Sequence, residues 1–475
     1  MRTALLLMTI VLFSLSTQAQ GYKIKVKVKG MNPNDTLLMG HRFSDKIFAD
    51  DTTLIDKSGY GVFKGSEMMD GGIYVILMPA KKNVYFEFLL DKDQQEFTLE
   101  TDTTDFLKNM KVSGSDLNKR FYEFQNKWVG LQNQAMEIHN KSKNLKEGSD
   151  SLAILQKEFQ KLDDDRIALL KKAYTDNPKS MLGLLARAMT PVDVPEIPLP
   201  EGTPEAKRDS LERLYKYVYN KDHYFDHFEF NDDRMLRTPL FEARLKEFIT
   251  KIVLMDPDSL TKESFILCDK AKAQKDVFRF VTVYLTNHFE TSNIMGMDRI
   301  FVNLVERYYT TGDAWWADST LTSKIIKRAN DLKPTLIGNI APDLRMETMD
   351  KQIVTLHQTK ADYTILVFFE PSCGHCKKAM PALFEWYNKV RGQKIEVFAV
   401  YTQVDEKEWK EFVDKYGFDW INVWDPYGFS NFRKYYDIVS TPVIMVLDKD
   451  KIIIAKKLGV EQIEQVIDHH RKFKK

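Results

Sequence analysis

The spacing of apolar and polar residues divides the 475-residue chain into three parts. Between residues 21 and 112, short apolar runs are separated by turn residues, and Tyr22-Lys-Ile-Lys-Val-Lys-Val-Lys29 alternates strictly between polar and apolar positions. A period of two residues gives a strand one buried face and one solvated face. This part therefore predicts a small all-β domain of the sandwich or barrel type, and we expect a β-sandwich.

From residue 113 to residue 333 apolar residues recur at helical spacing. Long amphipathic patterns begin at Ser115 and near Ser149, and Asn177-Pro178 ends the second of them. Four prolines within 190–202 predict an extended linker there. Further helical patterns cover 205–220, 239–254, 259–272, 276–289 and 297–309. An all-α middle domain follows from this part.

The last part, residues 334–475, alternates between strand and helix patterns. Tyr363 to Phe369 and Ile395 to Tyr401 are continuous apolar runs of strand length, and each is followed by an amphipathic helical pattern. Continuous apolar strands of this kind are buried on both faces of a sheet. The sequence therefore predicts an α/β domain with a central buried sheet.

The first twenty residues have the pattern of a secretory signal peptide. Met1-Arg-Thr precedes an apolar run from Ala4 to Leu15, and small residues lead up to Gln20. The run is too short to cross a bilayer comfortably, and no cysteine lies near the expected cleavage site. We therefore expect an exported protein of the periplasm or cell envelope, with residues 1–20 removed.

The charge and the cysteine content argue against a nucleic-acid partner and against structural disulfides. The 69 basic and 68 acidic residues nearly cancel, so no overall field attracts nucleic acid, and we expect no nucleic-acid partner. Three cysteines are too few to stabilise a large exported chain through structural disulfides. Cys268 lies in an apolar helical stretch, where a buried inert thiol is favoured over a regulatory or mixed-disulfide role.

The other two cysteines form a Cys-x-x-Cys motif between an apolar strand and an amphipathic helix. The segment reads Phe369-Glu-Pro-Ser-Cys373-Gly-His-Cys376, so the thiols stand at i and i+3 on a first helical turn and can close into a disulfide. Unpaired N–H groups at a helix start favour a thiolate on the first sulfur. The alternative, half of a zinc site, needs a second pair of ligands at metal spacing, which the surrounding sequence lacks. The motif predicts a redox site.

One further pair of residues has metal-ligand spacing. His223 and His227 stand four residues apart beside Asp222 and Asp226. The segment offers no glutamate between the histidines and no evident third ligand, and phenylalanines crowd it. A packed aromatic helix is favoured here, so we predict no metal and no cofactor.

The C-terminal third resembles the thioredoxin fold, in particular the TlpA/ResA-like thiol–disulfide oxidoreductases of bacterial envelopes. The resemblance is carried by the strand, Cys373-Gly-His-Cys376 and helix, by Pro381 inside that helix, and by Thr441-Pro442 ahead of a strand, where the family has a cis-proline. An additional strand–helix unit between these motifs is also similar to TlpA-like proteins. The upstream β and helical parts resemble those of multidomain exported thioredoxin-family proteins. The resulting expectation is a multidomain fold: signal peptide at 1–20, β-sandwich at 21–112, helical domain at 113–333 and thioredoxin-like domain at 334–475.

The resemblance implies the roles of the site residues. Cys373 attacks a substrate disulfide, and Cys376 resolves the mixed disulfide and forms the redox disulfide Cys373–Cys376. Gly374 and His375 tune the couple, with His375 donating or carrying positive charge beside the first sulfur. The backbone of Thr441, ahead of Pro442, pairs with the substrate chain. Implied partners are proteins with disulfides or dithiols, apocytochrome c among them, and a membrane thiol electron donor.

The sequence departs from the family at the groups that handle protons. Val367 stands where thioredoxin has an acidic residue, Ala379 where ResA-like proteins often have glutamate, and Ser372 where tryptophan is common. Glu370 either replaces the missing carboxylate or is a solvent-exposed loop acid.

Three other function classes compete with the reductase. An oxidase or isomerase uses the same residues. A peroxiredoxin would need a threonine where Glu370 stands, which disfavours it. A binding protein, with an accessory thioredoxin domain, is the third. The role of residues 21–333 and the oligomeric state are not predicted from the sequence.

Overall fold

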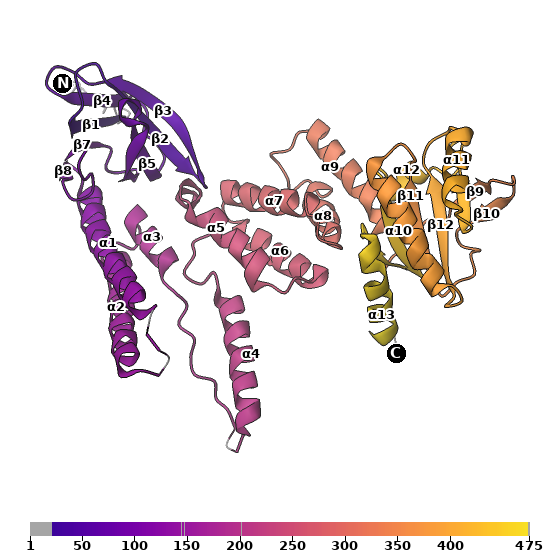
Figure 1. The fold of residues 1–475 in the computed structure, drawn as a ribbon. Helices are drawn as coiled ribbons and strands as arrows, with labels where there is room; N and C mark the ends of the chain where they lie inside the picture. The colour runs from indigo at the N-terminus through magenta and orange to yellow at the C-terminus, as the bar shows by residue number, and fades with distance from the viewer. Residues whose placement is uncertain (1–20, 144, 147, 201, 474–475) are drawn as a thin grey trace, which may run out of the picture. The chain divides into compact units, whose positions relative to one another are not determined.

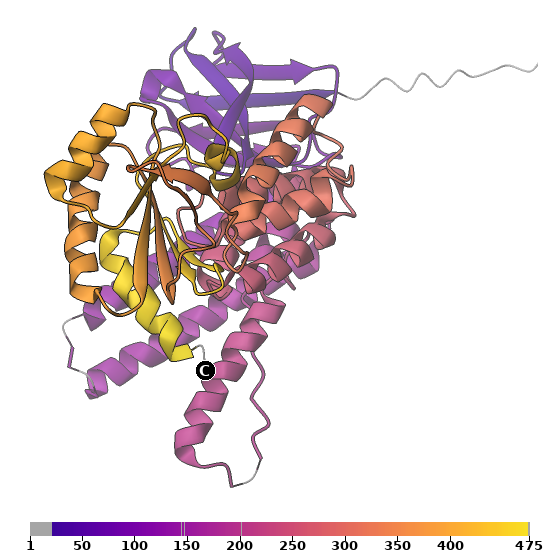
Figure 2. The ribbon, with the colours of Figure 1, turned by 90° about the vertical axis from the view of Figure 1, so that its right-hand side faces the viewer.

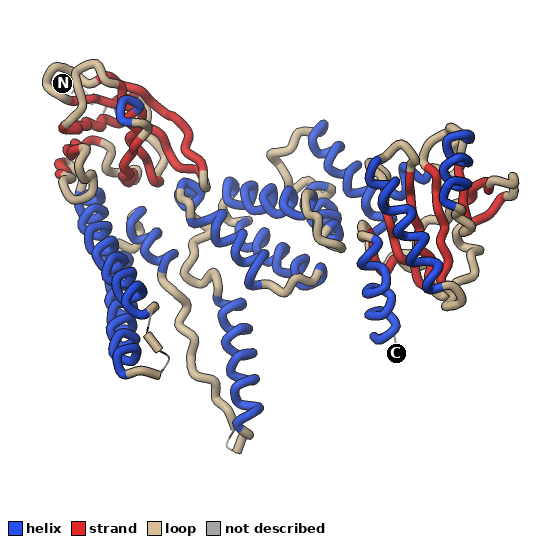
Figure 3. Tube along the Cα trace, viewed as in Figure 1, coloured by secondary structure: helices blue, strands red, loops and turns tan. Residues whose placement is uncertain are grey.

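The computed structural model describes residues 21–143, 145–146, 148–200 and 202–473, and the predicted signal peptide lies outside the described residues. Contacts within the chain divide it into two compact units, Met1–Val253 and Leu254–Lys475. Strands occur in the N-terminal and C-terminal parts, with helices between them (Figure 3). The multidomain fold class predicted from the sequence is confirmed, with N-terminal β-sheets, helices through the middle and a C-terminal α/β sheet. The predicted all-α region contributes helices to both units, and its exact boundaries remain a prediction.

The first unit begins with two four-stranded sheets that share one core. Their orders are β4-β1-β7-β8 and β3-β2-β5-β6. In β1 the apolar residues Ile24, Val26 and Val28 are buried, as the alternating pattern predicts. The strands are β1 (Tyr22–Lys29), β2 (Thr36–Phe43), β3 (Lys46–Leu54), β4 (Tyr60–Gly65), β5 (Gly72–Met78), β6 (Val84–Leu90), β7 (Glu96–Asp102) and β8 (Lys111–Ser113).

The helices of the first unit complete this core. Phe121 of α1 and Met181 of α3 are buried against the sheets, and α1 packs along α2 as a hairpin. Ser115, Ser149 and Ser180 each accept a backbone N–H at a helix start, which satisfies one of the free donors there. The proline-rich linker is extended, as predicted, and runs beside α4 in both views (Figures 1 and 2). The helices are α1 (Asp116–Ser142), α2 (Asp150–Asp176), α3 (Met181–Met189), α4 (Glu205–His223) and α5 (Leu240–Glu247), which continues as a π-helical turn (Phe248–Ile252).

The second unit begins with four helices that lead into the C-terminal sheet. They are α6 (Pro257–Ala271), α7 (Lys275–Glu290), α8 (Asp298–Leu304), which continues as a π-helical turn (Val305–Tyr309), and α9 (Ser319–Leu332). In the described part of the chain, no helix is both long enough and apolar enough to cross a membrane.

A seven-stranded sheet in the order β10-β9-β13-β12-β11-β14-β15 forms the centre of the second unit. Residues 363, 365, 367 and 369 of β11 face a core formed with α10, α11 and α13, whereas Leu366 and Phe368 face the core on the α12 side. The elements are β9 (Arg345–Thr348), β10 (Ile353–Thr355), β11 (Tyr363–Phe369), α10 (Gly374–Val390), β12 (Ile395–Tyr401), α11 (Glu406–Tyr416), β13 (Ile421–Trp424), α12 (Phe432–Tyr436), β14 (Val443–Asp448), β15 (Ile453–Lys456) and α13 (Ile463–Phe473).

The strand directions place several loops at one edge of this sheet. β11, β12 and β13 are parallel, and their last residues Phe369, Tyr401 and Trp424 are in register. β14 is antiparallel to β11 and starts opposite its end, with Val443 beside Phe368. The loops after β11, β12 and β13 and the loop before β14 therefore lie together, and the Cys-x-x-Cys motif is in the first of them.

Candidate active site

The end of β11 and the start of α10 position the two cysteines. Cys373 is the N-cap of α10, partly exposed, and Cys376 lies one turn later and is fully buried. Both are free thiols in this structure, so the redox disulfide between them stays a prediction. The different burial of the two sulfurs gives each a distinct chemical character.

The start of α10 lowers the pKa of Cys373. The backbone N–H groups of Cys376 and His375 lower the pKa of the Cys373 thiol, because they favour a thiolate more than partial burial opposes it. Cys376 has the opposite shift, because burial raises the pKa of its thiol to about 11. The exposed sulfur is thus the better nucleophile near neutral pH, and the buried one holds its proton.

The loop before β14 closes the site from the other side. The thiol of Cys373 donates a hydrogen bond to the carbonyl oxygen of Thr441, with the two atoms 3.2 Å apart. The Thr441–Pro442 bond is cis, in agreement with the sequence expectation. The two motifs that the sequence singled out, 68 residues apart, are therefore in direct contact.

Gly374, His375 and Glu370, the supporting residues near the two cysteines, have different surroundings. Gly374 opens α10 with open space where a side chain would lie. His375 is exposed and acts on Cys373 through its backbone N–H. The carboxylate of Glu370 accepts hydrogen bonds from Ser372 (3.1 Å) and from Gln403 (2.6 Å) in the loop after β12. The side chain of Glu370 thus connects two loops, while its backbone N–H partly offsets the raised pKa of Cys376.

The positions of the family's carboxylates hold apolar side chains here. Val367 is fully buried in the core beneath α10, and Ala379 is half-buried within α10. Neither position therefore provides a carboxylate that could accept the proton of Cys376.

The third cysteine lies apart from this site. Cys268 is fully buried in α6, where the hydroxyl of Thr282 approaches its sulfur at 3.6 Å. Burial raises the pKa of Cys268 to about 12. An inert packed thiol, as the sequence favoured, fits this environment.

The two histidines at metal spacing do not share a helix face. α4 ends at His223, so His227 lies in the turn that follows, contrary to the expected helix. His223 stacks on Tyr219 with ring centroids 4.0 Å apart and pairs with Asp226 at 2.5 Å.

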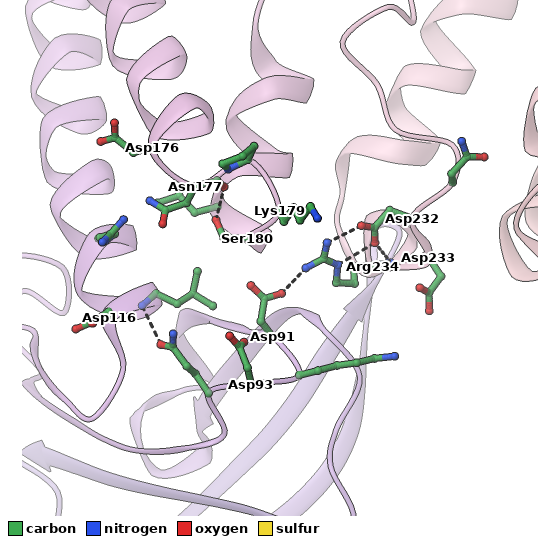
Figure 4. Close-up of a pocket in the computed structure, with 17 residues that line it drawn as sticks. Asp91, Asp93, Asp116, Asp176, Asn177, Lys179, Ser180, Asp232, Asp233 and Arg234 are labelled. Atoms are coloured by element: carbon green, nitrogen blue, oxygen red, sulfur yellow. Dashed lines mark hydrogen bonds and ion pairs between the residues drawn. The ribbon is translucent and has the colours of Figure 1, made fainter.

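A charged pocket of about 800 Å³ lies in the first unit, among β6, α1, α3 and the turn at 232–234 (Figure 4). Asp91 at its centre accepts a hydrogen bond from the guanidinium of Arg234 (2.6 Å) and another from the backbone N–H of Met181 (2.9 Å). Arg234 also pairs with Asp232 (Figure 4). These charges satisfy one another and fix α3 against the sheets, so their evident role is structural.

Sequence reasoning missed several residues around the cysteines. Val404, Tyr427, Phe429 and Val439 are apolar, strongly exposed and located in the loops at the same sheet edge. No periodic pattern marks them, because each lies in a loop between regular elements. The signal that could have found Tyr427 and Phe429 was the occurrence of large apolar residues in the turn-rich stretch 425–431.

Comparison with known proteins assigns families to all three regions. Residues 337–456 match the AhpC/TSA family, residues 168–332 a domain of unknown function (DUF5106) and residues 22–121 another (DUF4369). The thiol–disulfide oxidoreductase ResA of Bacillus thuringiensis is 26% identical over 137 residues, which are 29% of this chain and 78% of ResA. The thioredoxin-like protein YneN of Bacillus subtilis is 28% identical over 137 residues, 28% of this chain and 78% of YneN.

Solved structures are similar to parts of the chain as well. A domain of a possible thiol-disulfide isomerase from Cytophaga hutchinsonii is 37% identical and matches 29% of this chain and 94% of its own, with a TM-score of 0.28. A thioredoxin-like protein from Bacteroides caccae is 19% identical and matches 58% of this chain and 98% of its own, with a TM-score of 0.46.

Proposed function

Because residues 337–456 form a thioredoxin-fold domain of the AhpC/TSA family that is homologous to ResA-type thiol–disulfide oxidoreductases, we propose that this protein reduces disulfides of other proteins through Cys373 and Cys376. The observation that supports this most directly is the opposite shift of the two thiol pKa values. A helix start lowers the pKa of the exposed sulfur, while burial raises the pKa of the other. An attacking thiolate next to a protonated resolving thiol is the arrangement that the two-step exchange needs.

In the first step, the thiolate of Cys373 attacks one sulfur of the substrate disulfide. A bond forms between Cys373 and that sulfur, the substrate S–S bond breaks, and the other substrate sulfur leaves as a thiolate. The backbone N–H groups of His375 and Cys376 hold the attacking charge beforehand. The carbonyl oxygen of Thr441, next to the reacting sulfur, offers the substrate backbone a hydrogen-bond acceptor once Cys373 has lost its proton.

In the second step, Cys376 loses its proton and attacks the sulfur of Cys373. The Cys373–Cys376 disulfide forms, the mixed disulfide breaks and the second substrate thiolate leaves, so the substrate gains two electrons and the dithiol loses two. The negative charge of Cys373 contributes to the raised pKa of Cys376, and this contribution ends when Cys373 enters the mixed disulfide. With Val367 and Ala379 in place of carboxylates, the departing substrate thiolate is the proton acceptor at hand.

A membrane thiol electron donor would return the disulfide to the dithiol, and apocytochrome c or other oxidised envelope proteins are the proposed substrates. The Gly-His pair between the cysteines suggests a reduction potential between about −180 mV, as in protein disulfide isomerase, and about −270 mV, as in thioredoxin. Function in the periplasm or envelope follows from the signal-peptide pattern of residues 1–20. Isomerase or oxidase activity of the same dithiol is the alternative, as is a partner-binding protein with an accessory thioredoxin domain.

The test is reduction of insulin disulfides by the purified chain with dithiothreitol as reductant. We expect Cys373→Ser to abolish catalysis, because the attacking sulfur is lost, and Cys376→Ala to accumulate mixed disulfides with partners. Cys268→Ser is the matched control and should keep full activity, because Cys268 is buried away from the site. Equal activity of the Cys373→Ser variant and the wild-type protein would refute the proposal, as would a wild-type protein that reduces no disulfide.

A further inference from the structure

The most exposed large apolar side chains among the described residues lie in loops at the same sheet edge as Cys373. Among large apolar residues in the described part of the chain, the four with the highest exposed fractions are Val439 (85%), Phe429 (82%), Tyr427 (75%) and Val404 (70%). All four lie in the loops at the sheet edge that carries Cys373. Scattered apolar residues on a surface are ordinary, but a concentration at one place indicates a binding surface.

Hydrogen bonds within the loop at 425–430 fix the backbone that carries two aromatic rings. The carboxylate of Asp425 accepts the backbone N–H groups of Phe429 (2.9 Å) and Ser430 (2.7 Å), and also the hydroxyl of Ser430 (2.6 Å). The rings of Tyr427 and Phe429 lie side by side, with centroids 5.8 Å apart. Because these bonds fix the backbone of the loop, binding of a partner has to order only the two side chains and not the loop itself.

The loops are also linked to one another. The guanidinium of Arg433, in α12 directly after the aromatic loop, donates to the carbonyl oxygen of Thr402, which opens the loop holding Val404. Glu370 links the Val404 loop to the motif loop through Gln403. The aromatic pair, Val404 and Cys373 are thus parts of one connected surface.

The mixed disulfide formed with Cys373 indicates that a substrate polypeptide occupies this surface. In a mixed disulfide the partner's half-cystine is one covalent bond from the sulfur of Cys373, so the residues flanking that half-cystine must lie across this edge. An exchange of disulfides between proteins therefore brings a segment of the substrate chain to the sheet edge at which these four apolar residues lie.

We propose that Tyr427 and Phe429 form a docking site for the substrate polypeptide and select substrates with an apolar side chain near the disulfide. This inference rests on the proposed function and adds a substrate class to it. The aromatic loop follows β13, two strands away from β11, which corresponds to about 10 Å at a strand spacing of about 4.8 Å. An extended chain advances about 3.3 Å per residue, so the selected side chain lies about three residues from the half-cystine. Val404, after the intervening strand β12, lies between the two positions.

The test uses the full chain, reduced, and two synthetic peptides with one disulfide each, identical except for Phe or Ser three residues from the half-cystine. Hydroxyethyl disulfide serves as a small substrate that does not reach the aromatic loop. We expect the second-order rate constant of the reduced wild-type protein to be about tenfold higher for the Phe peptide than for the Ser peptide in a single turnover. The double variant Tyr427→Ser/Phe429→Ser should lose this preference and reduce hydroxyethyl disulfide at the wild-type rate.

Phe473→Ser is the matched control, since Phe473 is also an exposed ring (69%). It ends α13, where the neighbouring His470 contacts Tyr363 at the opposite end of β11 from the motif. This variant should keep the wild-type preference.

Several results would overturn the inference. One is a wild-type protein without preference between the peptides, and another is a double variant that retains the preference. An equal loss of rate with hydroxyethyl disulfide would assign the rings to the sulfur chemistry, and a wild-type dimer that the double variant converts to monomer would assign them to a second copy of the chain. In all these cases the proposed function stands. A wild-type protein that reduces none of the three substrates would refute the proposed function together with the inference.

Discussion

At the scale of single residues, the site depends on two thiols whose surroundings act in opposite directions. The largest contribution that lowers the pKa of Cys373 comes from the backbone N–H of Cys376, which a side-chain substitution does not remove. The group that raises the pKa of Cys376 is the surrounding core itself, through loss of hydration. The difference between the two sulfurs is therefore a property of the strand–helix junction.

This predicts the pH dependence of alkylation in the reduced protein. In the double variant Cys268→Ser/Cys376→Ser, the iodoacetamide reaction of Cys373 should reach half its maximal rate below the usual thiol pKa of about 8.5, because a lowered pKa leaves more thiolate at a given pH. In Cys268→Ser/Cys373→Ser, the remaining Cys376 should react with a midpoint above that value, since burial, the largest cause of its raised pKa, persists without Cys373. Rates measured from about pH 5 to pH 10 by mass spectrometry, a range that brackets the usual thiol pKa, provide the check. Superimposable profiles for the two cysteines would contradict the assignment of nucleophile and resolving thiol.

At the scale of elements, α10 begins with a glycine that its geometry does not require. Gly374 occupies the first helical position, a β-carbon added there would meet no atom within 4 Å, and its φ is not in the left-handed region. Gly417, which ends α11, has equally open surroundings but a φ of +69°. Substitution of Gly374 therefore tests the effect of glycine flexibility in the unfolded chain, and substitution of Gly417 tests the effect of a left-handed backbone.

Gly374→Ala should increase the free energy of unfolding by about 0.5 kcal/mol, because alanine restricts the unfolded chain without strain in the helix. Gly417→Ala should decrease it by about 1 kcal/mol, because alanine disfavours the left-handed conformation. Urea unfolding measures both. Alkylation of Cys373 should be unchanged in Gly374→Ala, as its pKa depends on the N–H groups of the next residues. A destabilised Gly374→Ala variant would show that this position is constrained by something other than backbone freedom.

The elements around the motif were predictable because the order of apolar and polar residues in each matches the faces that are buried and exposed in the fold. β11 is apolar throughout and buried on both faces, and α10 starts at the motif, as its amphipathic pattern predicts. β2 and β3 were not foreseen. In β3 all nine side chains are exposed or half-buried, so its residues show no alternation from which to recognise a strand. The exposure of Tyr427 and Phe429 was equally hidden, because it follows from the hydrogen bonds of Asp425 and from neighbouring strands that are distant in sequence.

At the scale of the second unit as a whole, a buried ion pair joins the helices before the thioredoxin fold to its sheet. Lys456 at the end of β15 donates to the carboxylate of Asp298, the first residue of α8, and to the carbonyl oxygen of Thr335 (2.8 Å). The side chains of Lys456 and Asp298 are only 4% and 13% exposed. Burial lowers the pKa of Lys456 more than the nearby carboxylate raises it. The second carboxylate oxygen of Asp298 is buried and has no hydrogen-bond partner among the described residues.

In such a buried ion pair, removal of one charge should cost more stability than replacement of both charges by apolar side chains. Asp298→Leu leaves a buried ammonium without its counter-charge, and Lys456→Met leaves a buried carboxylate, so each should lower the free energy of unfolding by about 3 kcal/mol or more. The double variant Asp298→Leu/Lys456→Met removes both charges and should lose much less than the sum of the single losses. Urea unfolding of the four proteins completes the cycle, with Lys407→Met as a control, because the Lys407–Glu411 pair is exposed and should contribute little. Additive losses in the cycle would mean that the two charges act independently and would contradict the coupling expected from their contact.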